Sequence, residues 1–319
     1  MRLYLIRHGE TVDNVAGLYA GMKDSPLTNH GVEQIKRLGS SFARNDVRFT
    51  HIFASPLSRA FRTAQAVRDA QPKIDIDPEK QLEIEKVDEL IERHFGFYEG
   101  KPFNTRADEK QAEKDRATPG FVDVESKEAM AKRVDSFLDQ QLLPLLEEDS
   151  KDFVVAVVAH GMLLANFWRR LLLRLPRQSL VIAPEIAEKR SGAVLEYLGG
   201  WSNTGYMELS FQRPEGPPDP PTILPISGSR QAGTAGATVL STPIPPRAEP
   251  EDAAVSLAAV EGDEKAAPRL LSGWSTTILA IDSTIHLLGL KRQRGGIGSL
   301  AHDEGQRKLD SFFKKPGLT

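Results

Sequence analysis

Two histidines, each followed by glycine, stand at the ends of apolar runs that lie far apart in the sequence. One is in Arg7-His8-Gly9, after the run Leu3–Ile6, and the other is in Ala159-His160-Gly161, after the run Phe153–Val158. Continuous apolar runs of this length are typical of buried parallel strands, which present ligands at their carboxyl ends. The glycine lets the chain turn sharply and leaves the imidazole accessible. The two rings are therefore predicted to face one pocket.

Two arginines add positive charge to the same edge. Arg7 directly precedes the first histidine, and Arg59 follows a third apolar run, His51–Ala54. Ser55 is expected to cap a helix that has Pro56 at its first position, which places Arg59 in the first turn. Guanidinium groups match phosphate oxygens bidentately, and a helix N-terminus favours anions. A lone histidine or arginine at a strand end is usually structural, but this joint pattern predicts a pocket for a tetrahedral anion.

Segments with helical periodicity alternate with these apolar runs. One is expected to begin near Thr28 and to carry Val32, Ile35 and Leu38 on one face, and a longer one follows Ser126. This alternation predicts an α/β fold for residues 1–213, a three-layer α/β/α arrangement with a mostly parallel central sheet.

The order of these motifs resembles the histidine phosphatase superfamily, with its phosphoglycerate mutase-like and fructose-2,6-bisphosphatase-like members. The resemblance runs in order through residues 1–213 and covers none of the C-terminal third. The residues that carry it are Arg7-His8-Gly9-Glu10-Thr11 with Asn14, Ser25-Pro26-Leu27-Thr28 with Gly31 and Gln34, Ser55-Pro56-Leu57-Ser58-Arg59-Ala60 with Thr63-Ala64, Leu90-Ile91-Glu92 with Phe95-Gly96 and Glu99-Gly100, and Ala159-His160-Gly161.

The resemblance implies a phosphatase that works through a phosphohistidine, without a cofactor or a metal. His8 would be the nucleophile, with its second ring nitrogen held by a backbone carbonyl. Glu92 would protonate the leaving alcohol; the competing carboxylates are Glu10, taken as structural, and Glu99, taken as a loop residue. The catalytic set would then be His8, Glu92, His160, Arg7 and Arg59, and the substrate-binding set Arg7, Asn14, Gly21, Thr28, Arg59, Arg93, His160 and Gly161.

The sequence leaves the phosphate ester open. Glu92–Gly96 is similar to the corresponding run of cofactor-dependent mutases, whereas Arg7–Thr11 and Glu99–Lys101 are more similar to the fructose-2,6-bisphosphatase and broad phosphatase branches. Arg93, with Lys101 and Arg106, could bind a second anionic group or form a solvated charged face, and the solvated face is favoured. We expect a phosphatase for small phosphorylated sugars or glycolytic acids, with fructose 2,6-bisphosphate among the candidates. A phosphoglycerate mutase is the alternative.

The last third of the chain differs in composition. Of the 21 prolines, 11 lie between Pro214 and Pro268, so residues 214–270 are expected to form a disordered linker that cannot bury enough apolar surface to fold. Residues 271–319 form a C-terminal extension in this interpretation. Within it, Trp274–Leu290 is expected to be an amphipathic helix that docks on the domain or on a partner, with apolar residues roughly on one face: Ile278, Ile281, Ile285 and Leu288.

The end of the extension contains a motif at 306–313 that resembles the PIP-box, by which proteins dock on the sliding clamp PCNA. A 3₁₀ turn would place Leu309, Phe312 and Phe313 on one side as apolar anchors, with Gln306 hydrogen-bonding beside them. The alternative is a C-terminal helix whose apolar face packs on the protein itself. A PCNA-binding or scaffold protein, in which the phosphatase domain is incidental, is therefore the second hypothesis.

The composition excludes several classes of function. The chain of 319 residues has no cysteine, which rules out disulfides, thiolate catalysis, zinc ribbons and iron–sulfur clusters. A net charge of −3 gives no global case for binding nucleic acid or a membrane. Metal-binding patterns such as His-Glu-x-x-His do not occur. The first apolar run is too short for a signal peptide, so the expected location is the cytoplasm or the nucleus.

Overall fold

The structure is a computed structural model that describes residues 1–72, 82–105, 109–148, 153–189, 195–213, 271 and 273–303. Seven strands of the described residues form one sheet in the order β3-β2-β4-β1-β6-β7-β5. The strands are β1 (Arg2–Arg7), β2 (His51–Ala54), β3 (Ile84–Lys86), β4 (Val154–Ala159), β5 (Leu180–Ile182), β6 (Tyr206–Gln212) and β7 (Ser275–Ser283).

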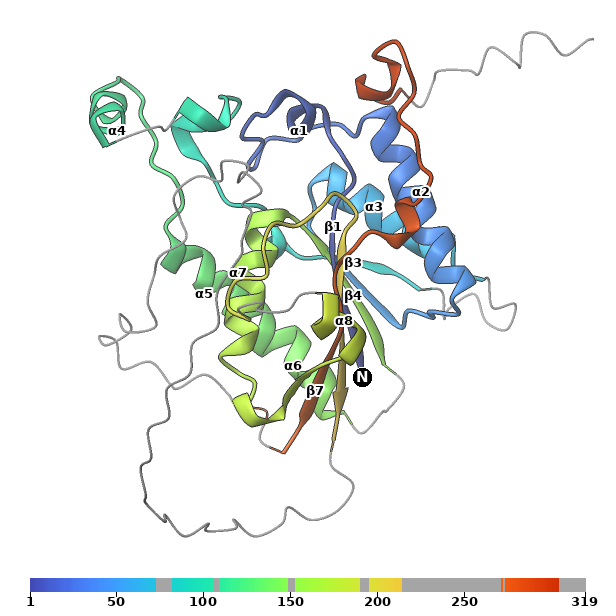
Figure 1. The fold of residues 1–319 in the computed structure, drawn as a ribbon. Helices are drawn as coiled ribbons and strands as arrows, with labels where there is room; N and C mark the ends of the chain where they lie inside the picture. The colour runs from blue at the N-terminus through green and yellow to red at the C-terminus, as the bar shows by residue number, and fades with distance from the viewer. Residues whose placement is uncertain are drawn as a thin grey trace, which may run out of the picture. The chain divides into compact units, whose positions relative to one another are not determined.

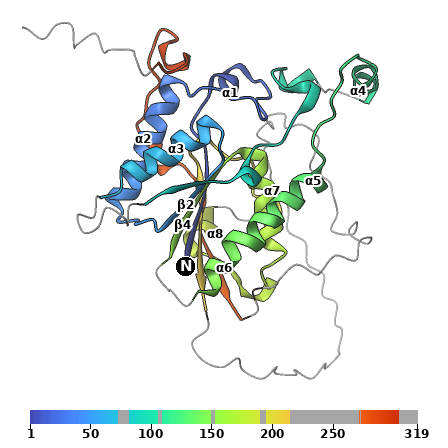
Figure 2. The same ribbon diagram turned by 180° about the vertical axis from the view of Figure 1, so that it is seen from behind.

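Helices cover both faces of this sheet. Helices α2 and α3 lie on one face, and α5, α6 and α7 lie on the other, as the two opposite views show (Figures 1 and 2). The predicted three-layer α/β/α fold is thereby confirmed. The helices are α1 (Val12–Ala16), α2 (Asn29–Arg44), α3 (Ser58–Asp69), α4 (Glu109–Arg116), α5 (Lys127–Phe137), α6 (Leu143–Glu147), α7 (Gly161–Leu172) and α8 (Pro184–Lys189).

The sheet is mostly parallel, as predicted. Strands β1, β2, β3 and β4 pair in parallel, and β5 pairs in parallel with β7. Only β6 is antiparallel to both of its neighbours, β1 and β7. Because two antiparallel pairings restore the original direction, β7 runs the same way as β1, and the carboxyl ends of β1, β2, β4 and β7 meet at one edge.

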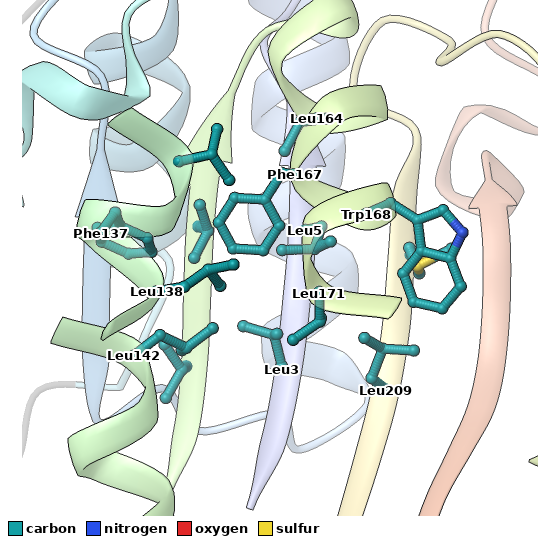
Figure 3. Packing of buried hydrophobic residues seen from close by; sticks show 14 of the residues in the cluster. Leu3, Leu5, Phe137, Leu138, Leu142, Leu164, Phe167, Trp168, Leu171 and Leu209 are labelled. Carbon is teal, nitrogen blue, oxygen red and sulfur yellow. The ribbon is translucent and has the colours of Figure 1, made fainter. Parts of the chain in front are cut away.

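The continuous apolar runs of the sequence are explained by burial on both faces of the sheet. In β1, Leu3 and Leu5 pack into the cluster formed with α5 and α7, where Phe137 and Phe167 also lie (Figure 3). The alternate residues Tyr4 and Ile6 pack into a second cluster with α2 and α3. Each fully buried Leu or Phe side chain stabilises the fold by about 1.5–3 kcal/mol, so this strand is firmly anchored.

Two predicted helix starts are confirmed and one is wrong. The Thr28 hydroxyl accepts a hydrogen bond from the Gly31 N–H at the start of α2, and Ser126 caps α5 in the same way. The third helix, α3, begins at Ser58 rather than directly after Ser55. The Ser55 hydroxyl lies instead 2.9 Å from His160 Nε2. The hydroxyl that the sequence pattern assigned to a helix cap therefore makes a tertiary contact.

The amphipathic helix predicted over Trp274–Leu290 is wrong. The segment forms β7, and only a 3₁₀ turn, Ile285–Leu287, follows it. Thr276, Ile278 and Ala280 are buried in alternation, which is the strand period, and β-branched residues favour a strand over a helix. Antiparallel β6 offers the edge with which these residues pair. Ile285 and Leu288, predicted on the buried face, are 63% and 74% exposed.

Two predictions fall outside the described residues. The linker expected over 214–270 is one, and the PIP-box-like motif at 306–313 is the other. Strand β7 nevertheless joins the same sheet as residues 1–213, since Gln212 of β6 pairs with Ser275 of β7 although the two are 63 positions apart. None of the helices in the described part of the chain has the length and hydropathy that a membrane span requires.

Candidate active site

The two histidines come together at the carboxyl ends of β1 and β4. Arg7 pairs with Ala159 in the parallel register, so His8 and His160 leave the sheet side by side. Their ring centroids are 5.1 Å apart with an angle of 59° between the planes, and both side chains are buried. Strand β2 lies on the other side of β4 and leads through Ser55 to Arg59. The juxtaposition predicted from strand order is therefore present.

His8 is held in one tautomer. Its Nδ1 lies 2.7 Å from the carbonyl oxygen of Gly9, so Nδ1 carries the proton and donates, which leaves the lone pair on Nε2. Burial, together with the positive charges of Arg59 and Arg7, lowers the pKa of the His8 imidazole well below its usual range. A neutral imidazole with a free Nε2 lone pair is the form that can attack phosphorus.

Arg59 is buried and fixed by three hydrogen bonds. Its Nη2 donates to the carbonyl of Gly21 at 2.7 Å, its Nη1 to that of Lys23 at 2.8 Å, and its Nε to His160 Nδ1 at 3.2 Å. Since Nδ1 accepts, the proton of the neutral His160 ring is on Nε2 and points to Ser55 Oγ. Both nitrogens of His160 thus contact protein groups, and the ring holds the Arg59 fork in place.

Arg7 differs because part of its guanidinium is unused. Its Nη1 donates to the carbonyl of Trp201, but its buried Nε has no hydrogen-bond partner among the described residues. Burial lowers the pKa of Arg7, and the negative charges of Glu92 and Asp282 oppose that effect. Gly161, the first residue of α7, lies beside this side chain, and a Cβ there would be in ordinary van der Waals contact with the Nε at 3.5 Å. A buried, unsatisfied cationic donor is a favourable place for an anion.

Glu92 is the carboxylate that lies near both arginines. Its Oε1 accepts from the backbone N–H of Leu163 at 3.0 Å and its Oε2 from that of Met162 at 3.3 Å, both in the first turn of α7. Its negative charge acts on both guanidinium groups. The alternatives lie elsewhere: Glu10 pairs with Arg292 and Thr28, and Glu99 accepts from the backbone of Met22 and Phe95.

Three other predicted binding residues have structural contacts. Asn14 Oδ1 accepts from the Thr11 N–H in a capping box and from Asn203 Nδ2. Gly21 has φ +53, and its carbonyl accepts from Arg59. The Thr28 hydroxyl has one proton and donates it to Glu10 while it caps α2, and its contact with substrate stays a prediction.

Arg93 does not form the solvated charged face favoured from the sequence, because its side chain is buried. Its Nε donates to the carbonyl of Glu125 at 2.9 Å. This bond joins the loop that carries Glu92 to the residues directly before α5. Arg106, which was grouped with it, lies outside the described residues.

Residues 3–183 match the sequence profile of the family described as histidine phosphatase superfamily (branch 1). The chain belongs to the histidine phosphatase superfamily. Among curated relatives, a probable phosphoglycerate mutase GpmB of Erwinia tasmaniensis is 31% identical over 220 residues, which cover 64% of this chain and 94% of the relative. An adenosylcobalamin/alpha-ribazole phosphatase of Escherichia coli is 39% identical over 99 residues, 31% of this chain and 43% of the relative.

A solved structure named "Mycobacterial hydrolase 1" is 25% identical, with a TM-score of 0.49, and the match covers 68% of this chain and 92% of that one. The relatives of this histidine phosphatase superfamily member thus include proteins named as phosphatases and as mutases. Membership accounts for the order of the motifs and for the enzyme class, a phosphatase or a mutase. It does not fix the substrate.

Some residues of this histidine phosphatase site were not predicted from the sequence. Trp201 and Asn203, in the loop before β6, contact Arg7 and the backbone of His8. Trp201 contributes only its carbonyl, which no side-chain pattern reveals. In the described part of the chain, no group of three or more His, Asp or Glu side chains is placed to hold a metal ion.

Acidification is expected to destabilise this histidine phosphatase. The pKa values of His8 and His160 are lowered well below their usual range, mainly by burial, whereas both imidazoles titrate normally in the unfolded chain. The unfolded state therefore binds more protons below about pH 6.5. The free energy of unfolding should then fall as the pH falls, by up to about 1.4 kcal/mol per pH unit for each ring.

Urea unfolding at pH 7.5, 6.5 and 5.5 measures this loss. His160→Gln should flatten the decline, because one of the buried neutral rings is removed. The buried ring of His286, whose pKa is lowered to about 4, acts in the same direction and stays in place in this variant. Equal declines in the wild type and in His160→Gln would contradict the assignment of a buried neutral imidazole.

Proposed function

We propose that the protein is a phosphomonoesterase that releases phosphate from small phosphorylated metabolites through a phosphohistidine on His8. The observation that supports this most is the pairing of two groups at the sheet edge. The His8 Nδ1–H bond to Gly9 leaves Nε2 free to attack, and Arg7 Nε–H is buried without a partner among the described residues. A neutral nucleophile beside a fixed cationic donor is the arrangement that phosphoryl transfer requires.

In the first step of the proposed reaction, His8 Nε2 attacks phosphorus. The N–P bond forms, the P–O bond to the substrate alcohol breaks, and Glu92 in its protonated form gives its proton to the leaving oxygen. In the second step a water attacks phosphorus while the Glu92 carboxylate takes one of its protons. The N–P bond then breaks, which returns neutral His8 and releases phosphate.

The arginines would stabilise the charge on the three non-bridging oxygens. A guanidinium has five N–H groups, and three of those of Arg59 donate to Gly21, Lys23 and His160, so two remain for phosphoryl oxygens. Because two fixed guanidinium groups supply positive charge, the proposal includes no metal. His160 supports this arrangement by accepting from Arg59 Nε.

The surroundings favour a phosphatase over a mutase. A phosphoglycerate mutase must also hold the carboxylate of its substrate. Arg93 and Lys101 were named as able to bind a second anionic group, although a solvated charged face was favoured for them. The Arg93 side chain is buried and bonded to the Glu125 carbonyl, and the Lys101 ammonium lies over the Phe97 ring. Both cations considered for a second anionic group thus contact protein groups, which supports a single-phosphate pocket.

The proposal is tested by measuring phosphate release from fructose 2,6-bisphosphate, 2,3-bisphosphoglycerate, 3-phosphoglycerate and a panel of sugar monophosphates under identical conditions. Net release from at least one ester, with the label of ³²P-substrate found on His8, is the expected result. Interconversion of 3- and 2-phosphoglycerate without net release would replace the phosphatase by the mutase.

Docking on PCNA through Gln306, Leu309, Phe312 and Phe313 stays a prediction of the sequence, since these residues lie outside the described ones. Titration of a peptide of residues 301–319 against purified PCNA tests it, and no binding at tens of micromolar peptide would remove it. The result is independent of the phosphatase proposal, because the motif and the active site use different residues.

A further inference from the structure

The loop 201–205, which we name the supporting loop, contacts both the nucleophile and its neighbouring arginine. The Trp201 carbonyl accepts from Arg7 Nη1, and the Gly205 carbonyl accepts from the Arg7 backbone N–H at 3.1 Å. The His8 carbonyl accepts from the Thr204 N–H at 3.1 Å and from Asn203 Nδ2 at 3.2 Å. A shift of this loop would therefore move the Arg7 guanidinium and the backbone that carries His8.

Asp282, at the end of β7, holds the first part of the supporting loop. Its Oδ1 accepts from the Ser202 N–H at 2.8 Å and its Oδ2 from the Ser202 hydroxyl at 2.7 Å. The Asp282 carboxylate lies against Gly205, where a Cβ would be 2.0 Å from Oδ1, so only glycine fits at this position without a shift of the carboxylate. Two hydrogen bonds to a carboxylate next to Trp201 fix the carbonyl that Arg7 uses, because bonds to a charged acceptor are the strong ones.

His286, in the turn after β7, holds the second part of the same loop. The Thr204 hydroxyl donates its proton to the Asn203 carbonyl at 2.7 Å, so at 2.9 Å it accepts from His286 Nε2–H. His286 is buried, and burial, with the charge of Arg37, lowers its pKa to about 4. The ring is thus neutral at physiological pH and works as a fixed donor.

The backbone at this junction is strained on both sides. Thr204 has φ +58 and Asp282 has φ +46, and a left-handed conformation is costly for residues with a Cβ, above all for a β-branched threonine. Such conformations persist only where surrounding contacts fix them, and they gather at functional sites. Here the contacts that fix them are the Asp282–Ser202 and His286–Thr204 bonds.

Both holding residues lie outside the part of the chain that the family profile matches, which ends at residue 183. They reach the site because β7 runs parallel to β1, with β6 between them, so that its carboxyl end meets the site edge (Figure 1). Both bonds that Ser202 makes to a carboxylate among the described residues therefore depend on β7.

We propose that Asp282 and His286 are positioning residues of the phosphoryl-transfer site, which act through the supporting loop on Arg7 and on the backbone of His8. In this proposal, the segment after residue 271 contributes Asp282 and His286 to the support of the active site. This inference rests on the proposed function, because it concerns the rate of phosphoryl transfer to His8.

The test measures phosphoenzyme formation in Asp282→Asn and in wild type by rapid quench. Both proteins are mixed with an excess of a phosphate ester that the wild type hydrolyses. Asparagine tolerates the left-handed backbone and keeps the shape of the side chain, but it removes the charge and one acceptor oxygen. The rate constant for phosphoenzyme formation should fall by about 10- to 100-fold, the size of effect expected from a small misplacement of a reacting group. The fraction of chains able to form phosphoenzyme, taken from a fit that also includes its hydrolysis, should stay unchanged.

Ile278→Ala is the matched control on the same strand. Its side chain is buried in the core beside Leu209 of β6, four positions before Asp282, so it should lower the melting temperature without changing the rate constant per phosphorylated chain. For the second holding residue, His286→Leu should slow phosphorylation, and His286→Gln, which restores a donor, should recover most of the rate. Ser202→Ala replaces Asp282→Asn if that variant does not fold, since it removes one of the two bonds.

The outcomes separate the two proposals. If wild type forms no phosphoenzyme on His8, the proposed function fails and the positioning role fails with it. If Asp282→Asn forms phosphoenzyme as fast as wild type, or forms less of it at an unchanged rate constant, the role of Asp282 is only structural and this inference is overturned.

Discussion

Replacing His8 with asparagine is expected to slow phosphomonoester hydrolysis by about 10⁴-fold or more, the size of loss found when an enzyme's nucleophile is removed. Asparagine is a sharp choice because its Nδ2 can still donate to the Gly9 carbonyl, as His8 Nδ1 does at 2.7 Å, while no atom takes the place of Nε2. The backbone bonds of His8 to Ala159 and Thr204 also remain. The loss should therefore come from chemistry and not from unfolding.

Two measurements check this result. Steady-state phosphate release gives the loss of turnover, and an alkaline quench followed by peptide mass spectrometry shows whether acid-labile phosphate is present on residue 8. His51→Asn is the control, since His51 lies at the opposite end of β2 and contacts Thr50. A phosphoenzyme in His8→Asn, or activity within tenfold of wild type, would show that another group is the nucleophile.

The elements that carry the nucleophile were predictable because their signals are local and strong. The runs before His8 and His160 are apolar over their whole length, which only a strand buried on both faces explains, and both faces are indeed covered by helices. Parallel pairing then brings the two strand ends together without further information. The Thr28 and Ser126 caps were predictable for the same reason, since each cap bonds a backbone N–H three residues on.

Strand β7 was not predictable from its own residues. Ile278 and Ile281 fit a helical face as well as they fit a bulged strand, and the partner strand that decides between the two lies more than 60 positions earlier in the chain. The β-branched Thr276 and Thr277 were the signal that favoured a strand. Missing the strand also hid Asp282 and His286, because their place at the site edge follows only from the direction of β7.

The hydrogen-bond partners of polar side chains could not be predicted from the sequence either. Ser55 was predicted to cap a helix and Arg93 to face solvent, and each instead bonds a group remote in sequence, His160 and the Glu125 carbonyl. Residue type states what a side chain can donate or accept, but only the assembled fold decides which acceptor is near. The site residues were therefore predicted as a set, and their hydrogen bonds were not.

The second large effect is expected at Arg59. Arg59→Lys keeps the positive charge but replaces a planar fork by a single nitrogen, which cannot reach Gly21 O, Lys23 O and His160 Nδ1 together. Those buried acceptors would lose their donor, and the two N–H groups left for phosphoryl oxygens would lose their fixed direction. Arginine side chains that stabilise a transferring phosphoryl group are worth about 10³-fold or more, so a loss of about 10³-fold in kcat/KM is expected.

The affinities of Arg59→Lys for orthovanadate and for inorganic phosphate show whether the direction of the N–H groups or the positive charge of Arg59 matters. If the direction of the N–H groups matters, orthovanadate, which mimics the pentacoordinate transition state, should bind Arg59→Lys more weakly by a factor close to the loss in kcat/KM, while inorganic phosphate loses less affinity. Arg68→Lys is the control on the same helix, where Arg68 pairs only with Asp69 in the described structure, and it should change neither quantity. If Arg59→Lys folds normally and stays within tenfold of wild type, positive charge alone is sufficient at this position. The bonds of the fork to Gly21, Lys23 and His160 would then stabilise the loop without directing the guanidinium at the phosphoryl group.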